Sequence, residues 1–342
     1  MFRILGRNPS GEDLLLFNGS SNYRKGAFQN ESFTDLRLKD ASFFKMMRLL
    51  INKPKTVNPS FSLPSVKTDL RLLDSEGPLI IWFGHSSYLI RYMGMTILVD
   101  PVLSGRVSPV SFFGNSFPGT DIYSPEDFPD IDLMILTHDH YDHLDYKTIS
   151  AFSAKTRHFY VPLGLDAHLK FWGIDSAKIT SMDWWQTVTT AGGFQLTSTP
   201  ARHFTGRSLK RNQTLWTSFV LKMGAVSIFI GGDSGYDTHF KTIGDKFGPF
   251  NIAILESGQY NDMWPYIHLR PEESVRAAIE LQADLLLPVH WGKFALAFHD
   301  WDEPVKRVLS EAAEQKLSVT TPMIGEPIFL GSVHPDKEWW SL

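Results

Sequence analysis

The residues best suited to chemistry lie together in the segment 137–143, which reads Thr-His-Asp-His-Tyr-Asp-His. The segment follows the apolar run 131–136, so we expect it in a loop at the end of a buried strand, where functional residues often lie. His138 and His140 are two residues apart and point to the same side of an extended backbone. A turn after them brings Asp142 and His143 close by. Imidazole nitrogens and carboxylate oxygens are ligands that Zn²⁺ accepts, and the segment therefore predicts a metal site.

Three further residues follow apolar runs in the same way and are candidate partners of this motif. His203 follows the run 194–199, Asp233 follows 226–230 in a Gly-Gly-Asp-Ser-Gly turn, and His290 ends the run 284–289. Each of them alone is more often a hydrogen-bonded structural residue than a ligand. Together with the motif they predict a larger ligand set, assembled where strands end.

The composition limits how such a metal can be held. The chain has 342 residues and no cysteine, which excludes disulfides, iron–sulfur clusters, cysteine-bound zinc and a thiol nucleophile. Any metal must therefore be held by some of the 12 histidines and 37 acidic residues. The net charge of −4 argues against a nucleic-acid partner, because such proteins usually carry a basic excess.

The elements that must position these residues change in character near residue 78. Strands are predicted first in a meander and then in alternation with helices, which favours two mixed sheets with helices outside. The predicted strands are 79–83, 88–91, 95–99, 131–136, 158–161, 186–190, 194–199, 216–222, 225–230, 251–255 and 284–289. The predicted helices are 145–154, 163–172, 237–247, 271–282 and 303–315.

Residues 1–77 are interpreted as a basic N-terminal extension on or near a hydrolase domain formed by 78–342. Residues 1–75 hold 12 Lys and Arg against 7 Asp and Glu, so the rest of the chain carries the negative charge. An amphipathic helix predicted over 40–52 could contact a membrane surface or pack on the main domain. No secretory signal or spanning run is recognised, and the predicted location is the cytoplasm, with peripheral membrane contact as an option.

The order His-x-His-x-Asp-His, His, Asp, His resembles the metallo-β-lactamase superfamily. Within it, the chain is most similar to the phospholipases D that hydrolyse N-acyl-phosphatidylethanolamine. This resemblance rests on the stretches 82–85, 99–101, 140–146, 161–165, 183–185, 232–236, 247–250 and 290–297, several of which contain no metal ligand. It implies an α/β fold of the αββα sandwich type, with two mixed sheets flanked by helices.

The resemblance also implies a centre of two Zn²⁺ ions, although iron and manganese bind similar ligands. By this analogy His138, His140 and His203 hold the first ion, Asp142, His143 and His290 hold the second, and Asp233 bridges the two. Asp100 corresponds to an aspartate that orients the motif loop. The lack of cysteine disfavours antibiotic hydrolysis, because most zinc β-lactamases use a cysteine ligand. The length is too short for the insertion of the RNA-cleaving branch.

The implied reaction is cleavage of N-acyl phosphatidylethanolamine to N-acylethanolamine and phosphatidic acid by a metal-bound hydroxide. Asp142 would steer the proton of that hydroxide. His268 would bind the substrate phosphate or donate a proton, with a hydrogen bond at the start of the following helix as the alternative. The predicted partner is a phospholipid or a small anionic phosphodiester, and the oligomeric state is left open, with a dimer as one option.

Two other functions remain as alternatives: a soluble lactonase or phosphodiesterase acting on a small phosphorylated metabolite, and a metal-binding scaffold without catalysis.

His85 is interpreted as a buried turn residue near the site rather than a ligand. Trp264 and Trp291 are placed near the pocket, where they could contact an acyl chain or belong to the core. The basic residues of 202–211 could attract an anion or form a solvated loop; they are Arg202, Arg207, Lys210 and Arg211. The remaining histidines are expected to be surface or packing residues: His158, His168, His239, His299 and His334.

Overall fold

The computed structural model describes residues 2–36, 48, 52–73, 77–110 and 113–341. Most of the helix predicted over 40–52 lies outside these described residues. In the described part, no helix is both long enough and apolar enough to cross a bilayer.

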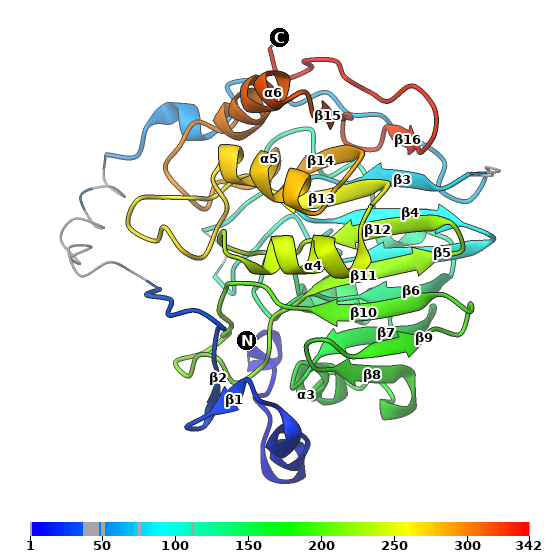
Figure 1. The fold of residues 1–342 in the computed structure, drawn as a ribbon, viewed down its shortest axis with the longest axis vertical. Helices are drawn as coiled ribbons and strands as arrows, with labels where there is room; N and C mark the ends of the chain where they lie inside the picture. Colours follow the sequence, from blue (N-terminus) through cyan, green and yellow to red (C-terminus); the bar gives the residue numbers. More distant parts are fainter. Residues whose placement is uncertain (1, 37–47, 49–51, 74–76, 111–112, 342) are drawn as a thin grey trace.

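Two seven-stranded mixed sheets form the centre of the molecule (Figure 1). The first sheet has the order β16 (Pro327–Phe329), β3 (Leu79–Trp82), β4 (Tyr88–Tyr92), β5 (Met95–Val99), β6 (Ile131–Ile135), β7 (Thr156–Pro162), β8 (Ile179–Met182). The second has the order β15 (Ser318–Val319), β14 (Leu285–Val289), β13 (Ile252–Glu256), β12 (Val226–Ile230), β11 (Ser218–Met223), β10 (Gln195–Thr199), β9 (Thr187–Thr189). In each sheet four strands run parallel, β5 to β8 and β12 to β15, and the other pairs are antiparallel.

Helices cover the outer face of each sheet, so the predicted αββα sandwich is confirmed. The helices are α2 (Tyr146–Phe152), α3 (Asp166–Phe171), α4 (His239–Phe247), α5 (Pro271–Glu280) and α6 (Glu303–Gln315). Apolar side chains of α2 and α3 pack on the first sheet, and those of α4, α5 and α6 pack on the second. Alternation along β3 shows why both faces are apolar: Ile80 and Trp82 lie in the core between the sheets, whereas Ile81 lies under the helices.

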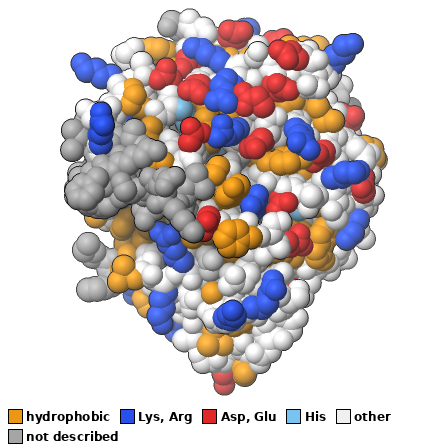
Figure 2. All heavy atoms as spheres, turned by 60° about the vertical axis from the view of Figure 1, so that its left-hand side comes forward, with side chains coloured by type: hydrophobic (Ala, Val, Ile, Leu, Met, Phe, Trp, Pro, Cys, Tyr) orange, Lys and Arg blue, Asp and Glu red, His pale blue; other side chains and the backbone are white. Residues whose placement is uncertain are grey.

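The N-terminal segment packs on the main body, against helices α2 and α3 and against loops that follow strands of both sheets. It contains short 3₁₀ turns, Phe2–Leu5 and Gly11–Gly19, and the hairpin β1 (Tyr23–Arg24) and β2 (Ala27–Phe28). Phe17 and Phe28 are buried with Trp184 and Trp216 of the main body. On the face shown in Figure 2, acidic and basic side chains are interspersed over the part that the structure describes.

The carboxyl ends of the strands that carry candidate residues meet at one edge of the sandwich. In the first sheet, Asp100 follows β5 and the motif follows β6. In the second, Asp233 follows β12, Glu256 ends β13 and His290 follows β14. Because ligands bind outside the carboxyl ends of strands in such sheets, the fold itself brings the candidates together.

Candidate metal centre

One cluster of possible ligands lies where the motif loop meets the second sheet. It consists of His138, His140, His203 and Asp233, whose ligand atoms all lie within 4.8 Å of one another. Nε2 of His138 and Nε2 of His203 lie 3.0 Å and 3.1 Å from Nδ1 of His140. The structure thus brings together the residues predicted for the first ion, together with the predicted bridge.

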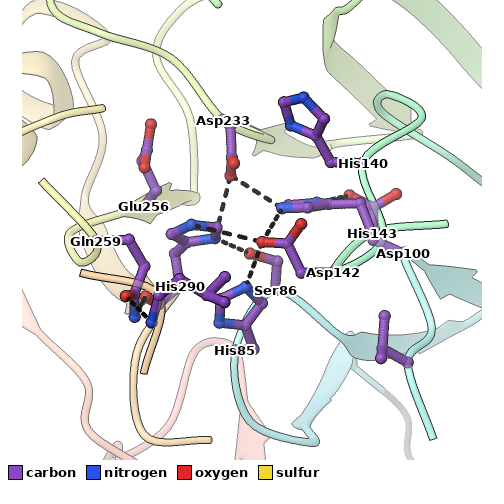
Figure 3. A network of polar contacts seen from close by, with 12 residues as sticks. His85, Ser86, Asp100, His140, Asp142, His143, Asp233, Glu256, Gln259 and His290 are labelled. Atoms are coloured by element: carbon purple, nitrogen blue, oxygen red, sulfur yellow. Dashed lines mark hydrogen bonds and ion pairs between the residues drawn. The ribbon is translucent and has the colours of Figure 1, made fainter. Parts of the chain in front are cut away.

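A second cluster lies beside the first and contains His85, Asp142, His143 and His290. Figure 3 shows Asp233 facing both His143 and His290, with the carboxylate of Asp142 close to the same two rings. Oδ1 of Asp233 is 3.1 Å from Nε2 of His143 and 3.1 Å from Nδ1 of His290. Its Oδ2 is 3.7 Å from both His138 and His203 in the first cluster. One carboxylate oxygen of Asp233 therefore faces each cluster, which is the arrangement that a bridging ligand needs.

The protonation of these groups, except that of His143, fits a metal centre. Burial opposes charge on His143, but Asp233 and Asp100 outweigh it and raise the pKa of His143 well above its ordinary value. Burial lowers the pKa of His138, His203 and His290 well below the ordinary value, so these imidazoles are neutral. Burial opposes ionisation of Asp233, but His143 and His290 outweigh it and hold the pKa of Asp233 well below its usual range. Neutral imidazole and ionised carboxylate are the forms that bind metal.

Buried atoms without hydrogen-bond partners also indicate a metal centre. Nε2 of His143, Nε2 of His290 and Oδ1 of Asp233 are buried and have no hydrogen-bond partner. Buried polar atoms are nearly always hydrogen-bonded, because leaving one unpaired costs roughly 1–3 kcal/mol. Cations held between these atoms would remove that cost, and the residues present therefore fit the metal ions that the fold implies.

Asp100 lies behind the motif loop and holds two of its residues. Its carboxylate accepts hydrogen bonds from Thr137 N at 2.8 Å and Thr137 Oγ1 at 2.6 Å, and it pairs with His143 Nδ1 at 2.7 Å. Because Nδ1 of His143 donates to this carboxylate, Nε2 is the nitrogen left for a metal. The orienting role predicted for Asp100 agrees with these contacts.

His85 is a buried turn residue beside the centre, as the sequence predicted. Its Nε2 is 3.0 Å from Oδ2 of Asp142, and its ring is fully buried. His85 and His143 outweigh the effect of burial and hold the pKa of Asp142 well below its usual range. His85 is thus placed to fix the carboxylate of a predicted ligand.

Glu256 is a residue of the site that sequence reasoning missed. Its carboxylate is buried, accepts a hydrogen bond from Ser234 N, and lies 2.7 Å from Nδ1 of His268. Burial opposes charge on both groups and raises the pKa of Glu256, while at His268 the Glu256 carboxylate outweighs burial and raises the pKa of the imidazole. This contact, rather than the alternative bond at the start of α5, is the one His268 makes through Nδ1. In the sequence, Glu256 could have been found only from its place directly after the apolar run 251–255.

The two clusters open into a cavity of about 800 Å³. Its polar lining includes His140, Asp142, His268 and Arg211, and its apolar lining includes Leu36, Val107, Phe204, Trp264, Ile267 and Leu296. Trp264 lies in this pocket as proposed, whereas Trp291 lies in the core and stacks on Trp339. Of the two positions considered for these tryptophans, Trp264 therefore takes the pocket and Trp291 the core.

The basic residues of 202–211 have separate positions instead of forming one anion-attracting group. Arg211 lines the cavity. Arg207 is buried and donates to the carbonyls of Asp139 and Leu144, which fixes the motif loop from behind. Arg202 donates to the N-terminal segment at Phe33 O. His168, expected at the surface or in packing, is fully buried and lies 3.2 Å from the Asp139 carboxylate.

Comparison with known proteins agrees with this geometry. Residues 95–291 match the family model described as a beta-lactamase superfamily domain. An uncharacterized protein of Mycobacterium tuberculosis is 37% identical over 338 residues, covering 94% of this chain and 88% of the relative. The N-acyl-phosphatidylethanolamine-hydrolyzing phospholipase D 1 of Caenorhabditis elegans is 30% identical over 275 residues, covering 72% and 77%.

Solved structures share the fold at lower identity. A metallo hydrolase from the archaeon Ignicoccus hospitalis superposes with a TM-score of 0.57 at 19% identity, covering 75% of this chain and 99% of its own. Together with the paired ligand clusters, these similarities show that the chain belongs to the metallo-β-lactamase superfamily and is a metal-dependent hydrolase.

Proposed function

We propose that the protein is a phosphodiesterase with two metal ions, of phospholipase D type, which cleaves N-acyl phosphatidylethanolamine to N-acylethanolamine and phosphatidic acid. The observation that carries this proposal is the pair of clusters that Asp233 connects, one carboxylate oxygen facing each, in the lining of one cavity with both charged and apolar walls. The printed name of the Caenorhabditis elegans relative supports the choice of substrate. We propose zinc as the metal because histidine dominates the ligand set.

The cavity suits the polar part of such a lipid. Its volume of about 800 Å³ lies within the range of roughly 300–1,000 Å³ that is usual for small-ligand sites. A phospholipid with three acyl chains is larger than this, so most of the diacylglycerol part would stay outside. Arg211 can face the phosphate, and the apolar wall near Trp264 and Leu296 can face the beginning of an acyl chain.

Each predicted ligand then has a role that its position allows. His138, His140 and His203 would hold one ion, Asp142, His143 and His290 the other, and Asp233 both. Two ions held by these residues would lower the pKa of a bound water and stabilise charge on the phosphate oxygens. Asp142 faces the cavity and is held by His85, so its carboxylate can accept a hydrogen bond from the attacking water and orient it.

His268 is placed to complete the reaction. Water oxygen bonds to phosphorus, the bond from phosphorus to the ethanolamine oxygen breaks, and that oxygen needs a proton to leave as an alcohol. His268 lines the cavity and keeps Nδ1 on Glu256, which leaves Nε2 to deliver the proton. Glu256 would hold the ring in this orientation.

The test compares three substrates with the zinc-loaded full chain: N-acyl phosphatidylethanolamine in mixed micelles, bis(p-nitrophenyl) phosphate and a phosphorylated lactone. We expect turnover of the lipid with release of N-acylethanolamine, and loss of nearly all turnover in Asp233→Asn. Activity on the soluble esters with none on the lipid would replace the proposal by the soluble lactonase or phosphodiesterase. Fewer than one metal per chain after zinc supplementation would contradict the centre of two ions.

A second experiment isolates His268. Because p-nitrophenolate leaves without a proton, His268→Gln should lower kcat on the lipid by the 10²–10⁴-fold typical of a lost general acid, and much less on bis(p-nitrophenyl) phosphate. Glu256→Gln should add little to the loss once His268 is replaced. Equal losses on both substrates would assign His268 to phosphate binding instead.

A further inference from the structure

The side chain of Asn30, in the N-terminal segment, pairs with the backbone of His203. Asn30 Nδ2 donates to His203 O at 2.9 Å, and His203 N donates to Asn30 Oδ1 at 3.1 Å. His203 lies four residues beyond the end of β10, and the Asn30 amide satisfies both of its backbone groups as a neighbouring strand would. The carboxamide is itself fixed, because Trp216 Nε1 also donates to Oδ1 at 3.1 Å.

The segment around Asn30 is anchored on both sides. Before it, Phe28 is fully buried and its N–H donates to Asn212 O at 2.9 Å. After it, the guanidinium of Arg202 donates to Phe33 O at 2.8 Å and to Thr34 Oγ1 at 3.0 Å. Asn30 therefore lies on a stretch of chain that is fastened to the main body at two points.

The His203 ring is buried against neighbouring rings and makes one hydrogen bond to the backbone. Its Nδ1 donates to Ile267 O at 2.7 Å, so Nε2 is left for a metal and lies toward His140 and Asp233. Ile267 thus sets the tilt of the ring, while Asn30 sets the backbone from which the ring extends. Loss of either contact would let Nε2 move away from the other ligand atoms.

We propose that Asn30 is a positioning residue of the metal centre, which makes metal affinity depend on the N-terminal segment. The proposal rests on the metal centre alone and is independent of the substrate. Partners that orient a metal ligand typically account for 10–100-fold in metal affinity. The segment would then be a part of the site instead of an accessory to it.

The first test measures zinc affinity of the full chain by competition with a chromophoric chelator, together with the melting temperature of the metal-free protein. Asn30→Ala removes all three hydrogen bonds, and Asn30→Asp removes only the donor to His203 O. The matched control is Asn22→Ala, which removes a half-buried asparagine of the same segment that bonds to Asp183. We expect both Asn30 variants to lose about tenfold or more in affinity at one of two zinc sites, and the control to stay within twofold. Equal affinity in all four proteins would overturn the proposal, even if the metal-free melting temperatures differ.

A second test needs no variant and remains valid if the Asn30 variants do not fold. Coupling is reciprocal, so zinc must stabilise the segment if the segment stabilises zinc. We expect zinc to slow hydrogen exchange of the Phe28 and Gln29 amides more than that of helix α6, which serves as the reference for general stabilisation. An equal effect on both would overturn the proposal. Neither test uses turnover, so failure here is distinguishable from failure of the proposed phospholipase activity.

Discussion

The carboxylate of Asp100 orients two residues of the motif loop, Thr137 and His143. The backbone geometry of Asp100 also makes this position well suited to a substitution test. Asp100 has a φ of 40°, in the left-handed region that asparagine and aspartate tolerate better than other side chains. Asn therefore changes the charge and the hydrogen-bond character without adding backbone strain.

Asp100→Asn should lower metal affinity by about 10–100-fold, with most of the loss at the position that includes His143. The amide can turn its NH₂ group toward His143 Nδ1, which favours the tautomer with the proton on Nε2 and blocks the metal-facing nitrogen. Metal titration with a competing chelator checks this, and circular dichroism controls for the fold. Wild-type affinity in the variant would show that Asp100 does not set the tautomer.

His239 makes a pH-dependent contribution to stability. It is buried at the start of α4 with Nε2 3.1 Å from Ser234 Oγ, and burial lowers its pKa to about 4. The unfolded chain has the higher pKa of about 6.5, so it binds the proton more readily and stability falls as the pH drops. Between pH 7 and pH 5 the loss from this group is about 2 kcal/mol.

Urea unfolding of metal-free wild type and His239→Asn at both pH values measures this contribution. The difference between the two proteins should shrink by about 2 kcal/mol from pH 7 to pH 5, because the metal-ligand histidines change equally in both. A constant difference would show that His239 has the same pKa in the folded and the unfolded protein.

At the scale of elements, the loops that carry Asp233 and His268 pack against each other at Gly235. A Cβ on Gly235 would lie 1.9 Å from Tyr266 O, which is a backbone atom and cannot turn aside. The Gly235 N–H also donates to Arg202 O at 2.8 Å, which joins this loop to the one carrying His203. Only glycine allows these three loops to approach so closely.

Gly235→Ala should therefore destabilise the protein by about 1–3 kcal/mol or more and reduce turnover, since the loops must separate to admit a methyl group. Gly19→Ala is the control, because a Cβ there meets nothing within 4 Å. Measurements of thermal unfolding and of kcat on both variants test this prediction. Similar behaviour of the two alanine variants would mean that the contact at Gly235 relaxes freely.

The strands and helices that sequence patterns predicted correctly are those with long apolar runs. The run 131–136 became β6, and the helix predicted at 271–282 became α5, which begins at Pro271 as expected. The strands β8, β15 and β16 were missed, and all three lie at sheet edges. Edge strands are short and paired on one side only, so a neighbouring strand determines them more than their own sequence does.

The candidate site shows the same limit. The motif was recognisable because its four candidate ligands lie within six residues: His138, His140, Asp142 and His143. The order of His203, Asp233 and His290 after it completed the resemblance to the superfamily. Glu256 and Asn30 were not found because each is a single polar residue that belongs to no recognisable motif. Asn30 is joined to His203 across 173 residues, and no periodicity or spacing in a sequence reports such a contact.

At the scale of the whole molecule, the centre joins the two sheets. The motif follows β6 of the first sheet, whereas His203, Asp233 and His290 follow strands of the second. Metal bound between them would hold the sheets together and stabilise the folded state over the unfolded one, in which the ligands are scattered.

Removing the metal should accordingly lower the melting temperature of the full chain, and adding zinc back should restore it. At a free zinc concentration of 100 Kd each site contributes about 2.7 kcal/mol. Asp233→Asn, which removes the carboxylate shared by the clusters, should respond less to zinc than wild type. Scanning calorimetry with and without a chelator measures both effects, and an unchanged melting temperature would show that metal binding is not linked to folding.

The division of ligands between the two sheets has a consequence for the order of events during synthesis. His138 and His290 are about 150 residues apart, and β16, which completes the first sheet beside β3, follows both of them. In a chain that emerges from the ribosome, the motif is therefore present early, but the full ligand set cannot assemble until nearly all of the chain has been made. A chain that holds metal at both clusters would therefore have its two sheets joined, because each cluster takes residues from both.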